Sequence, residues 1–378
     1  MRTTTTVEPA SIALLLLLLL TACGGSDSTG MGTGALRVVV STSGQDKDAT
    51  GYVVTVGEDS RSVGLDETVS FDGLEPGNQS VLIEDIAPNC SPYATSESVT
   101  IEAGATTDLD FDVECVTKRQ VVFWRWLGAK RDVFVMYTDG TGLTNLTNDD
   151  APELAPAWSP DGTKIAFVSA FVDGADLWVM GADGSNPTPL VQDDGEDNYP
   201  TWSPDGTKIA FSRGAPGQPF HIWVVDADGQ NLAPLTSGDG VYDVEPAWSP
   251  DGSTIAFSRD GDLWRMNADG SNPTLLTQNG NAPAWSPDGA KIAFDSFRSG
   301  LRADVYVMNA DGTDVRRLTT DPADDVHPAW SPDGTRIGFE SYTGGVDASL
   351  YLMKPDGSGV VLLADGAAGE SHQMDWKK

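Results

Sequence analysis

Side chains that could bind a ligand stand at fixed distances before six tryptophans of the chain. The tryptophans are Trp158, Trp202, Trp248, Trp285, Trp330 and Trp376, separated by steps of 37 to 46 residues. The acidic residues five places before four of them are Glu153, Asp197, Asp243 and Asp325. The residues three places before three of them are Tyr199, Glu245 and His327. Carboxylates, a phenol and an imidazole gathered at one place would attract a basic or amine-bearing partner, or a divalent cation.

Catalytic motifs are absent from the sequence. The three histidines are His221, His327 and His372, and H-E-x-x-H, G-x-S-x-G and a phosphate-binding glycine loop are lacking. His327 and His372 stand before neighbouring tryptophans and could form a pair. We therefore predict a binding protein and not an enzyme. The alternative is a hydrolase or lyase that uses carboxylates to act on a polysaccharide or a peptide.

Calcium is the only cofactor that the composition brings into question. The acidic segments DDGEDN (residues 193–198) and DPADDVH (residues 321–327) are the densest sources of oxygen ligands. Neither has the spacing of the twelve-residue calcium-binding loop. We therefore predict no cofactor, with calcium as the alternative.

A repeated β unit must position the residues before each tryptophan. The segment PAWSPDGTKIAF begins at Pro156 and returns near the other tryptophans. Its Ser-Pro-Asp-Gly favours a tight turn between two strands. An apolar run such as DLWVM (residues 176–180), an Ala-Asp-Gly turn and a short fourth strand complete the unit. Runs that are apolar on both faces fit strands between neighbouring sheets, so each unit predicts one blade of a β-propeller.

The two ends of the repeated region complete one blade. Residues 119–147 supply three strands of the unit, and QMDW (residues 373–376) is the missing tryptophan strand. We predict an all-β protein with a six-bladed propeller over residues 118–378, closed by the C-terminal strand. With the tryptophan strand innermost, the candidate binding residues converge at one mouth of the central channel.

The repeated pattern carries a resemblance to a known family. P-x-W-S-P-D-G-x-x-I-A-F, followed by I/L-W/Y-V-M-x-x-D-G, resembles the TolB-type propeller repeat, also called PD40 and related to the WD repeat. TolB is periplasmic, and its propeller holds the peptidoglycan-associated lipoprotein of the Tol-Pal system. TolB has an α/β domain where this chain has a different N-terminal part. The resemblance therefore implies an envelope scaffold and leaves the Tol-Pal role open.

The first residues have the features of an export signal. The apolar run SIALLLLLLL follows Arg2 and is too short to span a bilayer as a helix. Leu-Thr-Ala-Cys, ending at Cys23, resembles the bacterial lipobox, whose cysteine is lipidated. We predict a lipoprotein signal peptide over residues 1–22, acylation of Cys23 and a flexible Gly/Ser tether over residues 23–34. An ordinary secretory signal is the alternative.

Residues 35–117 predict a small β-sandwich before the propeller. Short alternating strands such as TTDLDFDVEC (residues 106–115) suit sheets with one buried face. The phrase LEPGNQSVLI resembles the Ig-like, carboxypeptidase-regulatory and PEGA-like sandwich domains of bacterial surface proteins. With Cys23 lipidated, Cys90 and Cys115 remain as a pair, and a pair in an exported protein predicts a disulfide.

Net charge limits the partners. The chain has 23 basic and 56 acidic residues, and its formal charge of −33 argues against binding nucleic acid or an anionic membrane surface. We predict a monomer that is lipid-anchored in the cell envelope, at the periplasmic face of the outer membrane or the cell surface. It contacts the membrane only through its N-terminal lipid, and its propeller binds an envelope protein or a cell-wall component. A purely structural surface lipoprotein is the remaining alternative.

Overall fold

The computed structural model describes residues 32–44, 46–47, 50–87, 89–92, 95–128, 130–171, 174–343, 347–365 and 371–378. The predicted signal peptide, Cys23 and most of the predicted tether lie outside these residues. All regular elements of the described part are β-strands, which confirms the all-β prediction. The same part contains no helix with the length and apolarity needed to cross a bilayer.

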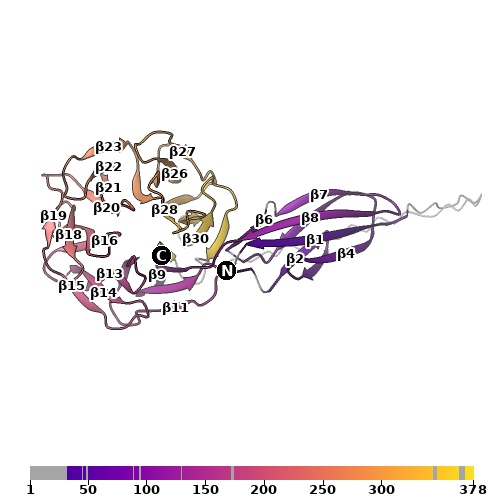
Figure 1. The fold of residues 1–378 in the computed structure, drawn as a ribbon, viewed down its shortest axis with the longest axis horizontal. Coiled ribbons are helices and arrows are strands. Elements are labelled where there is room, and N and C mark those ends of the chain that lie inside the picture. Colours follow the sequence, from indigo (N-terminus) through magenta and orange to yellow (C-terminus); the bar gives the residue numbers. More distant parts are fainter. Residues whose placement is uncertain are drawn as a thin grey trace, which may run out of the picture.

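Two four-stranded sheets form the N-terminal part, in the orders β4-β1-β8-β6 and β3-β2-β5-β7. Their strands are β1 (Gly34–Gly44), β2 (Tyr52–Val56), β3 (Asp59–Val63), β4 (Glu67–Leu74), β5 (Gly77–Glu84), β6 (Cys90–Pro92), β7 (Ser96–Ile101) and β8 (Thr106–Cys115). Residues of both sheets, among them Leu36, Val54 and Phe111, pack into one core. This is the packing of a β-sandwich. It lies beside the ring of the propeller (Figure 1).

A disulfide joins β6 to β8 in the sandwich. Cys90 and Cys115 stand directly opposite each other in this antiparallel pair, and their sulfur atoms are bonded at 2.01 Å. Both cysteines are buried, as the alternation of apolar and acidic residues before Cys115 predicts. The predicted pairing is present in the structure.

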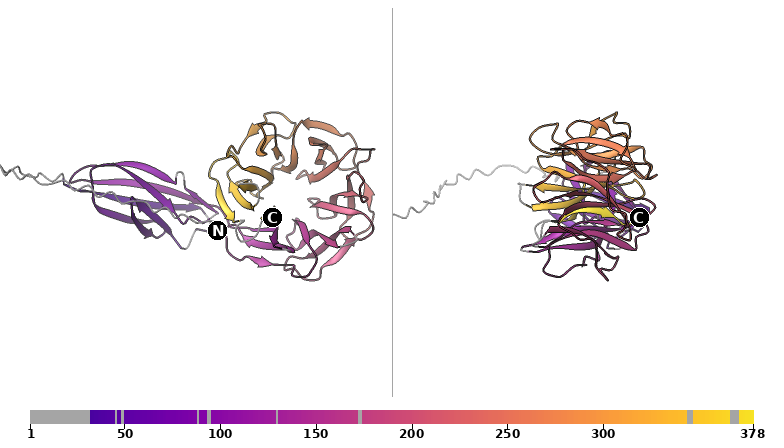
Figure 2. Two further views of the ribbon diagram at one scale, coloured as in Figure 1. Left: turned by 180° about the vertical axis from the view of Figure 1, so that it is seen from behind. Right: turned by 90° about the vertical axis from the view of Figure 1, so that its left-hand side faces the viewer.

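Six four-stranded sheets surround a central axis and form the propeller (Figure 2). The first blade combines β9 (Gln120–Leu127), β10 (Lys130–Tyr137) and β11 (Thr144–Asn145) with the C-terminal β32 (Ser371–Trp376). The second and third blades are β12 (Glu153–Trp158), β13 (Lys164–Phe171), β14 (Gly174–Gly181) and β15 (Thr188–Val191), then β16 (Glu196–Trp202), β17 (Lys208–Gly214), β18 (His221–Asp226) and β19 (Ala233–Pro234).

The later blades repeat the same order of strands. They are β20 (Asp243–Trp248), β21 (Thr254–Arg259), β22 (Asp262–Asn267) and β23 (Thr274–Thr277); β24 (Asn281–Trp285), β25 (Lys291–Ser296), β26 (Asp304–Asn309) and β27 (Arg316–Arg317); and β28 (Asp324–Trp330), β29 (Ile337–Thr343), β30 (Asp347–Met353) and β31 (Val361–Ala364). The tryptophan strand of each blade is innermost and lines the channel. The predicted propeller is confirmed.

Apolar clusters fill the spaces between neighbouring blades. Each second strand buries a phenylalanine at the same place: Phe123, Phe167, Phe211, Phe257, Phe294 and Phe339. Phe211, for example, belongs to one cluster with Leu177 of the preceding blade. The strands that are apolar on both faces are therefore covered on both sides, and burial of this surface holds the blades together.

The repeated turns use their aspartates and glycines for structure. Asp161 Oδ1 accepts hydrogen bonds from Ser159 Oγ at 2.7 Å and from Thr163 N at 3.0 Å. Gly270 has a φ of +83°, and a Cβ there would lie 2.4 Å from the carbonyl oxygen of Leu235 in the preceding blade. Glycine at this turn therefore allows both the left-handed backbone and the close approach of two blades.

The C-terminal strand lies at the seam between the first and second blades. β32 pairs antiparallel with β9, and Asp375 Oδ2 accepts a hydrogen bond from Trp158 N at 2.7 Å. Lys377 Nζ lies 4.8 Å from the ring centroid of Trp158, a distance at which a cation attracts an aromatic face. These contacts join the two ends of the propeller.

Candidate functional site

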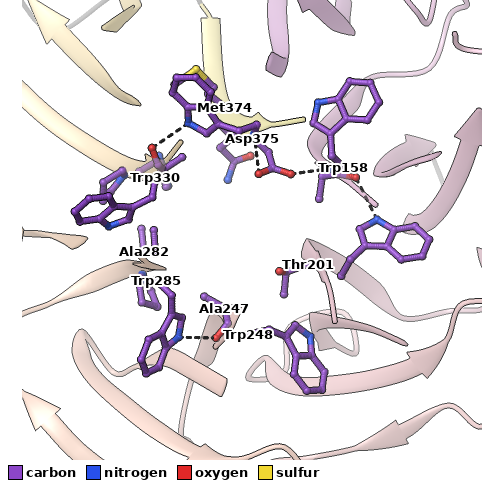
Figure 3. Close-up of a pocket in the computed structure, with 18 of the residues that line it drawn as sticks. Trp158, Thr201, Ala247, Trp248, Ala282, Trp285, Trp330, Met374 and Asp375 are labelled. Atoms are coloured by element: carbon purple, nitrogen blue, oxygen red, sulfur yellow. Dashed lines mark hydrogen bonds between the residues drawn. The ribbon is translucent and has the colours of Figure 1, made fainter. Parts of the chain in front are cut away.

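The innermost strands enclose a central channel of about 530 Å³ (Figure 3). One place before each tryptophan, its lining is formed by Ala157, Thr201, Ala247, Ala284, Ala329 and Asp375. The hairpin mouth is the end next to the turn at residues 159–162 and its equivalents. The connection mouth is the opposite end, where the chain enters each blade at residues 146–153 and their equivalents.

A strained residue lines the channel in every blade. Three places before each tryptophan, φ lies between 46° and 57° at Ala155, Tyr199, Glu245, Ala282, His327 and Gln373. The register between the first and second strands shifts here in all six blades, as at a β-bulge. A left-handed residue other than glycine costs about 1 kcal/mol or more. The fold therefore redirects the same position in each blade and varies only its side chain.

Neighbouring blades hold several of these bulges in place. The backbone N–H of the strained residue donates to the side chain that follows the buried phenylalanine of the preceding blade. The pairs are Glu245 with Ser212 (3.0 Å), His327 with Asp295 (3.2 Å) and Gln373 with Glu340 (2.6 Å). These hydrogen bonds stabilise the strained backbone and place acceptors directly behind the channel lining.

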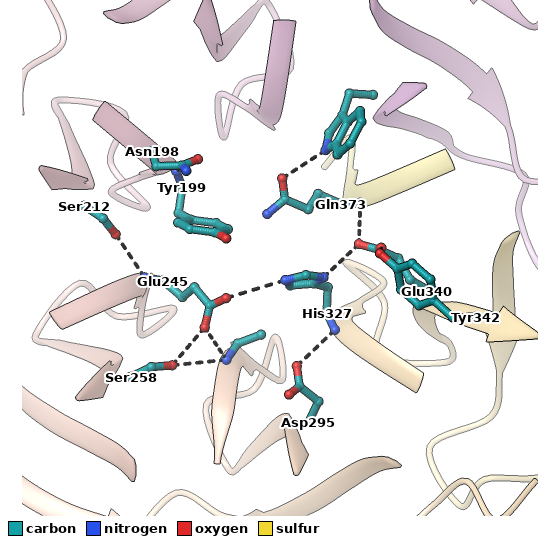
Figure 4. A network of polar contacts seen from close by, with 12 residues as sticks. Asn198, Tyr199, Ser212, Glu245, Ser258, Asp295, His327, Glu340, Tyr342 and Gln373 are labelled. Carbon is teal, nitrogen blue, oxygen red and sulfur yellow. Dashed lines mark hydrogen bonds and ion pairs between the residues drawn. The ribbon is translucent and has the colours of Figure 1, made fainter. Parts of the chain in front are cut away.

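An imidazole between two carboxylates forms the charged centre of the connection mouth (Figure 4). His327 Nδ1 lies 2.9 Å from Glu340 Oε1, and His327 Nε2 lies 3.5 Å from Glu245 Oε1. Burial alone would lower the pKa of His327, but the charges of Glu340 and Glu245 raise it well above its usual value. Burial would raise the pKa of Glu245, but its contact with His327 holds that pKa below its usual value. The pair of His327 with Glu245 links the fourth blade to the sixth across the mouth.

The remaining oxygens of these carboxylates also have protein partners. Glu245 Oε2 accepts hydrogen bonds from Ser258 Oγ at 2.9 Å and from Ala282 N at 2.8 Å. Tyr342 Oη donates to Glu340 Oε2 at 3.1 Å. Burial raises the pKa of Asp295, which lies behind His327, to about 6. The carboxylates around the imidazole are thus engaged in holding the mouth together.

Tyr199 and Gln373 offer polar groups to the channel. The Tyr199 ring lies 6.5 Å from the imidazole of His327, centroid to centroid, and its hydroxyl has no hydrogen bond to any described residue. Trp124 Nε1 donates to Gln373 Oε1 at 3.1 Å, which leaves the amide NH₂ of Gln373 for the channel (Figure 4). One hydroxyl and one amide are therefore available to a ligand at this mouth.

The four acidic residues five places before the tryptophans are buried and do not line the channel: Glu153, Asp197, Asp243 and Asp325. The prediction that they converge at the channel mouth with the other candidate binding residues is wrong. In a regular strand, residues five and three places before the tryptophan would face the same side. The β-bulge inserts one extra residue between the fourth and the first place before the tryptophan. This reverses the alternation for the residue five places before the tryptophan, so the carboxylates turn into the blades.

Two of these carboxylates form ion pairs with arginines directly opposite them in the second strand. Arg213 Nη1 lies 2.9 Å from Asp197 Oδ1, and Arg259 Nε lies 2.6 Å from Asp243 Oδ1. Burial raises the pKa of Asp197 to about 7, although the charge of Arg213 opposes this shift. These pairs are structural parts of the third and fourth blades.

The other two carboxylates face serines in the same register. Glu153 stands opposite Ser169, and Asp325 stands opposite Ser341. Because burial penalises the charged form, the pKa of Glu153 rises to about 8 and that of Asp325 to about 6. The second and sixth blades therefore bury a carboxyl group without the arginine that the third and fourth blades supply.

The acidic segments considered for calcium are used in local contacts. Asp193 pairs with Arg213, and Asp324 pairs with Arg302. Within the described part of the chain, no group of three or more His, Cys, Asp or Glu residues is placed to hold a metal ion. The side chain of His372, considered as a partner of His327, lies outside the description.

Sequence reasoning missed Asp295 and Glu340. Both directly follow the buried phenylalanine of a second strand, where the other blades have Trp124, Val168, Ser212 and Ser258. An acid occurs at this place only in the fifth and sixth blades, next to His327. Aligning the repeats on the phenylalanine as well as on the tryptophan would have revealed this signal.

Comparisons with known proteins agree with this architecture. Residues 118–282 match the model of the TolB β-propeller domain, and residues 252–371 match that of the Tricorn protease N-terminal β-propeller domain. No curated protein matches the chain.

Solved structures share the propeller fold. TolB from Acinetobacter baumannii is 23% identical with a TM-score of 0.61, over 68% of this chain and 66% of that one. A protein assigned as TolB from Agrobacterium tumefaciens is 24% identical with a TM-score of 0.55, over 69% of this chain and 99% of that one. A chain of the nidogen/laminin complex is 12% identical with a TM-score of 0.56, over 69% of this chain and 99% of that one. From residue 118 onward, the chain has a β-propeller fold, and its residues 118–282 are similar to the TolB β-propeller domain.

Proposed function

We propose that this protein is a lipid-anchored scaffold of the cell envelope whose propeller binds a protein or cell-wall partner at the connection mouth. The observation that carries the proposal is the set of six strained positions around the channel. They share one backbone conformation but differ in side chain, with alanine at two and larger polar residues at four. A position that the fold redirects toward the channel at an energetic cost in every blade is suited to recognition.

The polar groups at this mouth favour binding over catalysis. The imidazole of His327 is held between Glu245 and Glu340, and these carboxylates have further protein partners. A general base needs a lone pair within reach of a substrate proton. The hydroxyl of Tyr199 and the amide of Gln373 instead form a fixed set of hydrogen-bonding groups over a channel whose lining includes alanines, prolines and tryptophans, which is typical of a binding pocket.

The envelope location rests on the N-terminal sequence and on the TolB-type propeller. The Leu-Thr-Ala-Cys ending at Cys23 and the glycine-rich segment after it suit a lipid anchor followed by a tether. Replacing Cys23 by serine should release the protein from the membrane fraction. Continued membrane association of Cys23→Ser would contradict lipid anchoring without affecting the proposal for the propeller.

Two substitutions test binding at the connection mouth. Tyr199→Phe removes one hydroxyl and keeps the ring, and Ala155→Gln narrows the mouth with a side chain that Gln373 already places on the same backbone. The full-length protein is expressed in its own envelope, crosslinked and purified with its partners. We expect Ala155→Gln to reduce capture at least about tenfold and Tyr199→Phe about fivefold, the loss of one hydrogen bond.

The matched control changes the hairpin mouth. Ser253 is exposed in the first turn of the fourth blade, and Ser253→Gln adds a side chain of the same size as Ala155→Gln at the other end of the channel. It should leave capture unchanged. Equal capture by all variants would contradict binding at the connection mouth and favour a purely structural protein.

A further inference from the structure

The loop between β25 and β26 exposes two large apolar side chains. Phe297 is 53% exposed and Leu301 is 97% exposed. The loop covers residues 297–303 and joins the second and third strands of the fifth blade, at the same end as the connections between blades. It therefore lies at the same end of the propeller as the connection mouth. The corresponding loop of the fourth blade is only residues 260–261.

Arg298 holds the first half of this loop against the fifth blade. Its guanidinium lies 5.0 Å from the ring centroid of Phe294 and 5.1 Å from that of Tyr306. Nη2 donates to the carbonyl oxygens of Gln278 at 2.7 Å and Asn279 at 3.1 Å. The arginine turns into the blade and leaves Phe297 outside.

The second half is held by polar contacts with the connection to the sixth blade. Arg302 pairs with Asp324, and Asp324 Oδ1 also accepts a hydrogen bond from Ala303 N at 2.9 Å. Ser299 Oγ donates a hydrogen bond to Asp304 Oδ2. Arg317 Nη2 forms an ion pair with the other carboxylate oxygen, Asp304 Oδ1, at 2.7 Å. These polar contacts thus fix the loop on both sides of Leu301.

We propose that Phe297 and Leu301 are anchor side chains that insert into an apolar pocket of a partner protein. This inference rests on the proposed function and names the chemistry of its partner. A few apolar or aromatic anchors carry most of the binding energy of typical interfaces. A loop that is already ordered loses little conformational entropy when it binds, so its exposed side chains serve as preorganised anchors.

Charge distinguishes a partner protein from the other surfaces that an apolar loop could enter. The formal charge of −33 repels a second copy of this chain and an anionic lipid surface. Arg298 and Arg302 are turned to carbonyl oxygens and to Asp324. The two arginines of the loop are thus engaged in contacts within the protein and are not available to bind lipid phosphates. A protein with a neutral or basic rim around its apolar pocket fits this surface.

The test is the double variant Phe297→Ser and Leu301→Ser in the full chain. The protein captured in the experiment on Tyr199 and Ala155 is identified and purified, and its Kd is measured by titration calorimetry. We expect the double variant to raise the Kd at least about tenfold, with little change in the melting temperature because both side chains are exposed. The increase should persist at high salt, since apolar contacts are not screened.

The control removes exposed leucines elsewhere. Leu143 and Leu275 are 48% and 44% exposed and belong to the outer part of the first and fourth blades. Leu143→Ser with Leu275→Ser should leave the Kd unchanged. If Ala155→Gln weakens binding but the loop variant does not, the inference fails and the proposed function stands. If no protein is captured, both fail.

Two further measurements address the rejected surfaces. Wild-type and variant proteins are sedimented with vesicles of zwitterionic and of anionic lipids, and their self-association is followed by sedimentation velocity. We expect neither vesicle binding nor self-association to depend on Phe297 and Leu301. A loss of either in the variant, with partner affinity unchanged, would overturn the assignment of a protein pocket.

Discussion

The two ends of the propeller channel follow opposite rules. At the hairpin mouth, each of the last five blades repeats Ser-Pro-Asp-Gly, and its aspartate makes the same contacts from blade to blade. At the connection mouth, six blades share one strained backbone position but vary its side chain. A stable hairpin needs the same turn residues in every blade, whereas selective binding of a partner needs side chains that differ from blade to blade. The comparison therefore separates the structural end of the channel from the end that is suited to binding.

A second layer lies behind the variable mouth, and it is structural. Asp197 and Asp243 pair with arginines inside their blades, whereas Glu153 and Asp325 lack an arginine in the same register. The connection mouth thus combines variable residues at the channel with buried charges that tie its strands together.

Arg259→Ala should cause the largest loss of stability. Asp243 is fully buried and accepts two hydrogen bonds from Arg259, at 2.6 and 2.9 Å. Without the guanidinium, the buried carboxylate keeps only the more distant His221, whose Nδ1 lies 3.7 Å from Asp243 Oδ2, and the free energy of unfolding should fall by about 3–5 kcal/mol. Denaturant unfolding followed by tryptophan fluorescence measures this change.

The control is the partly exposed pair of Lys208 and Asp226, whose nitrogen and oxygen lie 2.5 Å apart. Lys208→Ala should cost less than about 1 kcal/mol. Similar losses for Arg259→Ala and Lys208→Ala would show that the connection mouth has no buried structural layer.

Glu153→Gln should change how stability depends on pH. The folded-state pKa of Glu153 is raised from 4.5 to about 8, so between these values the folded protein holds a proton that the unfolded chain has released. The contribution of this group is fully present below the unfolded pKa and is lost as pH rises through about 8. Relative to wild type, Glu153→Gln should therefore gain stability between about pH 5 and pH 8, on the order of 3 kcal/mol.

Ser169→Arg provides the complementary test in the same blade. It places a guanidinium opposite Glu153, where Arg213 and Arg259 stand in the next two blades. The melting temperature, measured as a function of pH, should then no longer show the pH-dependent contribution of Glu153. An unchanged pH profile in both variants would mean that Glu153 is not the group responsible.

Gly270→Ala, at the hairpin end, should lower the free energy of unfolding by about 2 kcal/mol. The residue has a φ of +83°, and a Cβ would meet the Leu235 carbonyl at 2.4 Å. Gly261 has nearly the same φ, +81°, but lies in a short loop of the connection end with nothing within 4 Å of an added Cβ. Gly261→Ala should cost about 1 kcal/mol, the conformational part alone. Equal losses in thermal unfolding would show that close approach of the blades does not matter at the hairpin end.

Much of the fold could be predicted because the repeated residues mark equivalent positions in successive blades. The spacing of Trp158 and the later tryptophans, together with the hairpin turns, indicated the blades, and QMDW indicated the seam with the first blade. The candidate site was predicted only in part. Tyr199, Glu245 and His327 do line the channel.

The rest depended on features that the pattern does not reveal. One extra residue in each innermost strand reverses the side on which Glu153 and Asp197 lie, and no change in polarity marks this bulge. Glu340 reaches His327 from another strand, so only the folded register brings them together. Anchoring at Cys23 stays a prediction.

Site-specific photocrosslinking within one blade tests the binding assignment most directly. Tyr242 is 49% exposed at the connection end of the fourth blade, and Ser253 is exposed in the hairpin turn of the same blade. A photoreactive phenylalanine analogue is placed at either position of the full-length protein in its native envelope. Binding at the connection mouth predicts one defined adduct from position 242, lost on adding Ala155→Gln, and none from position 253. An adduct from position 253 alone, or one from position 242 that survives Ala155→Gln, would contradict it.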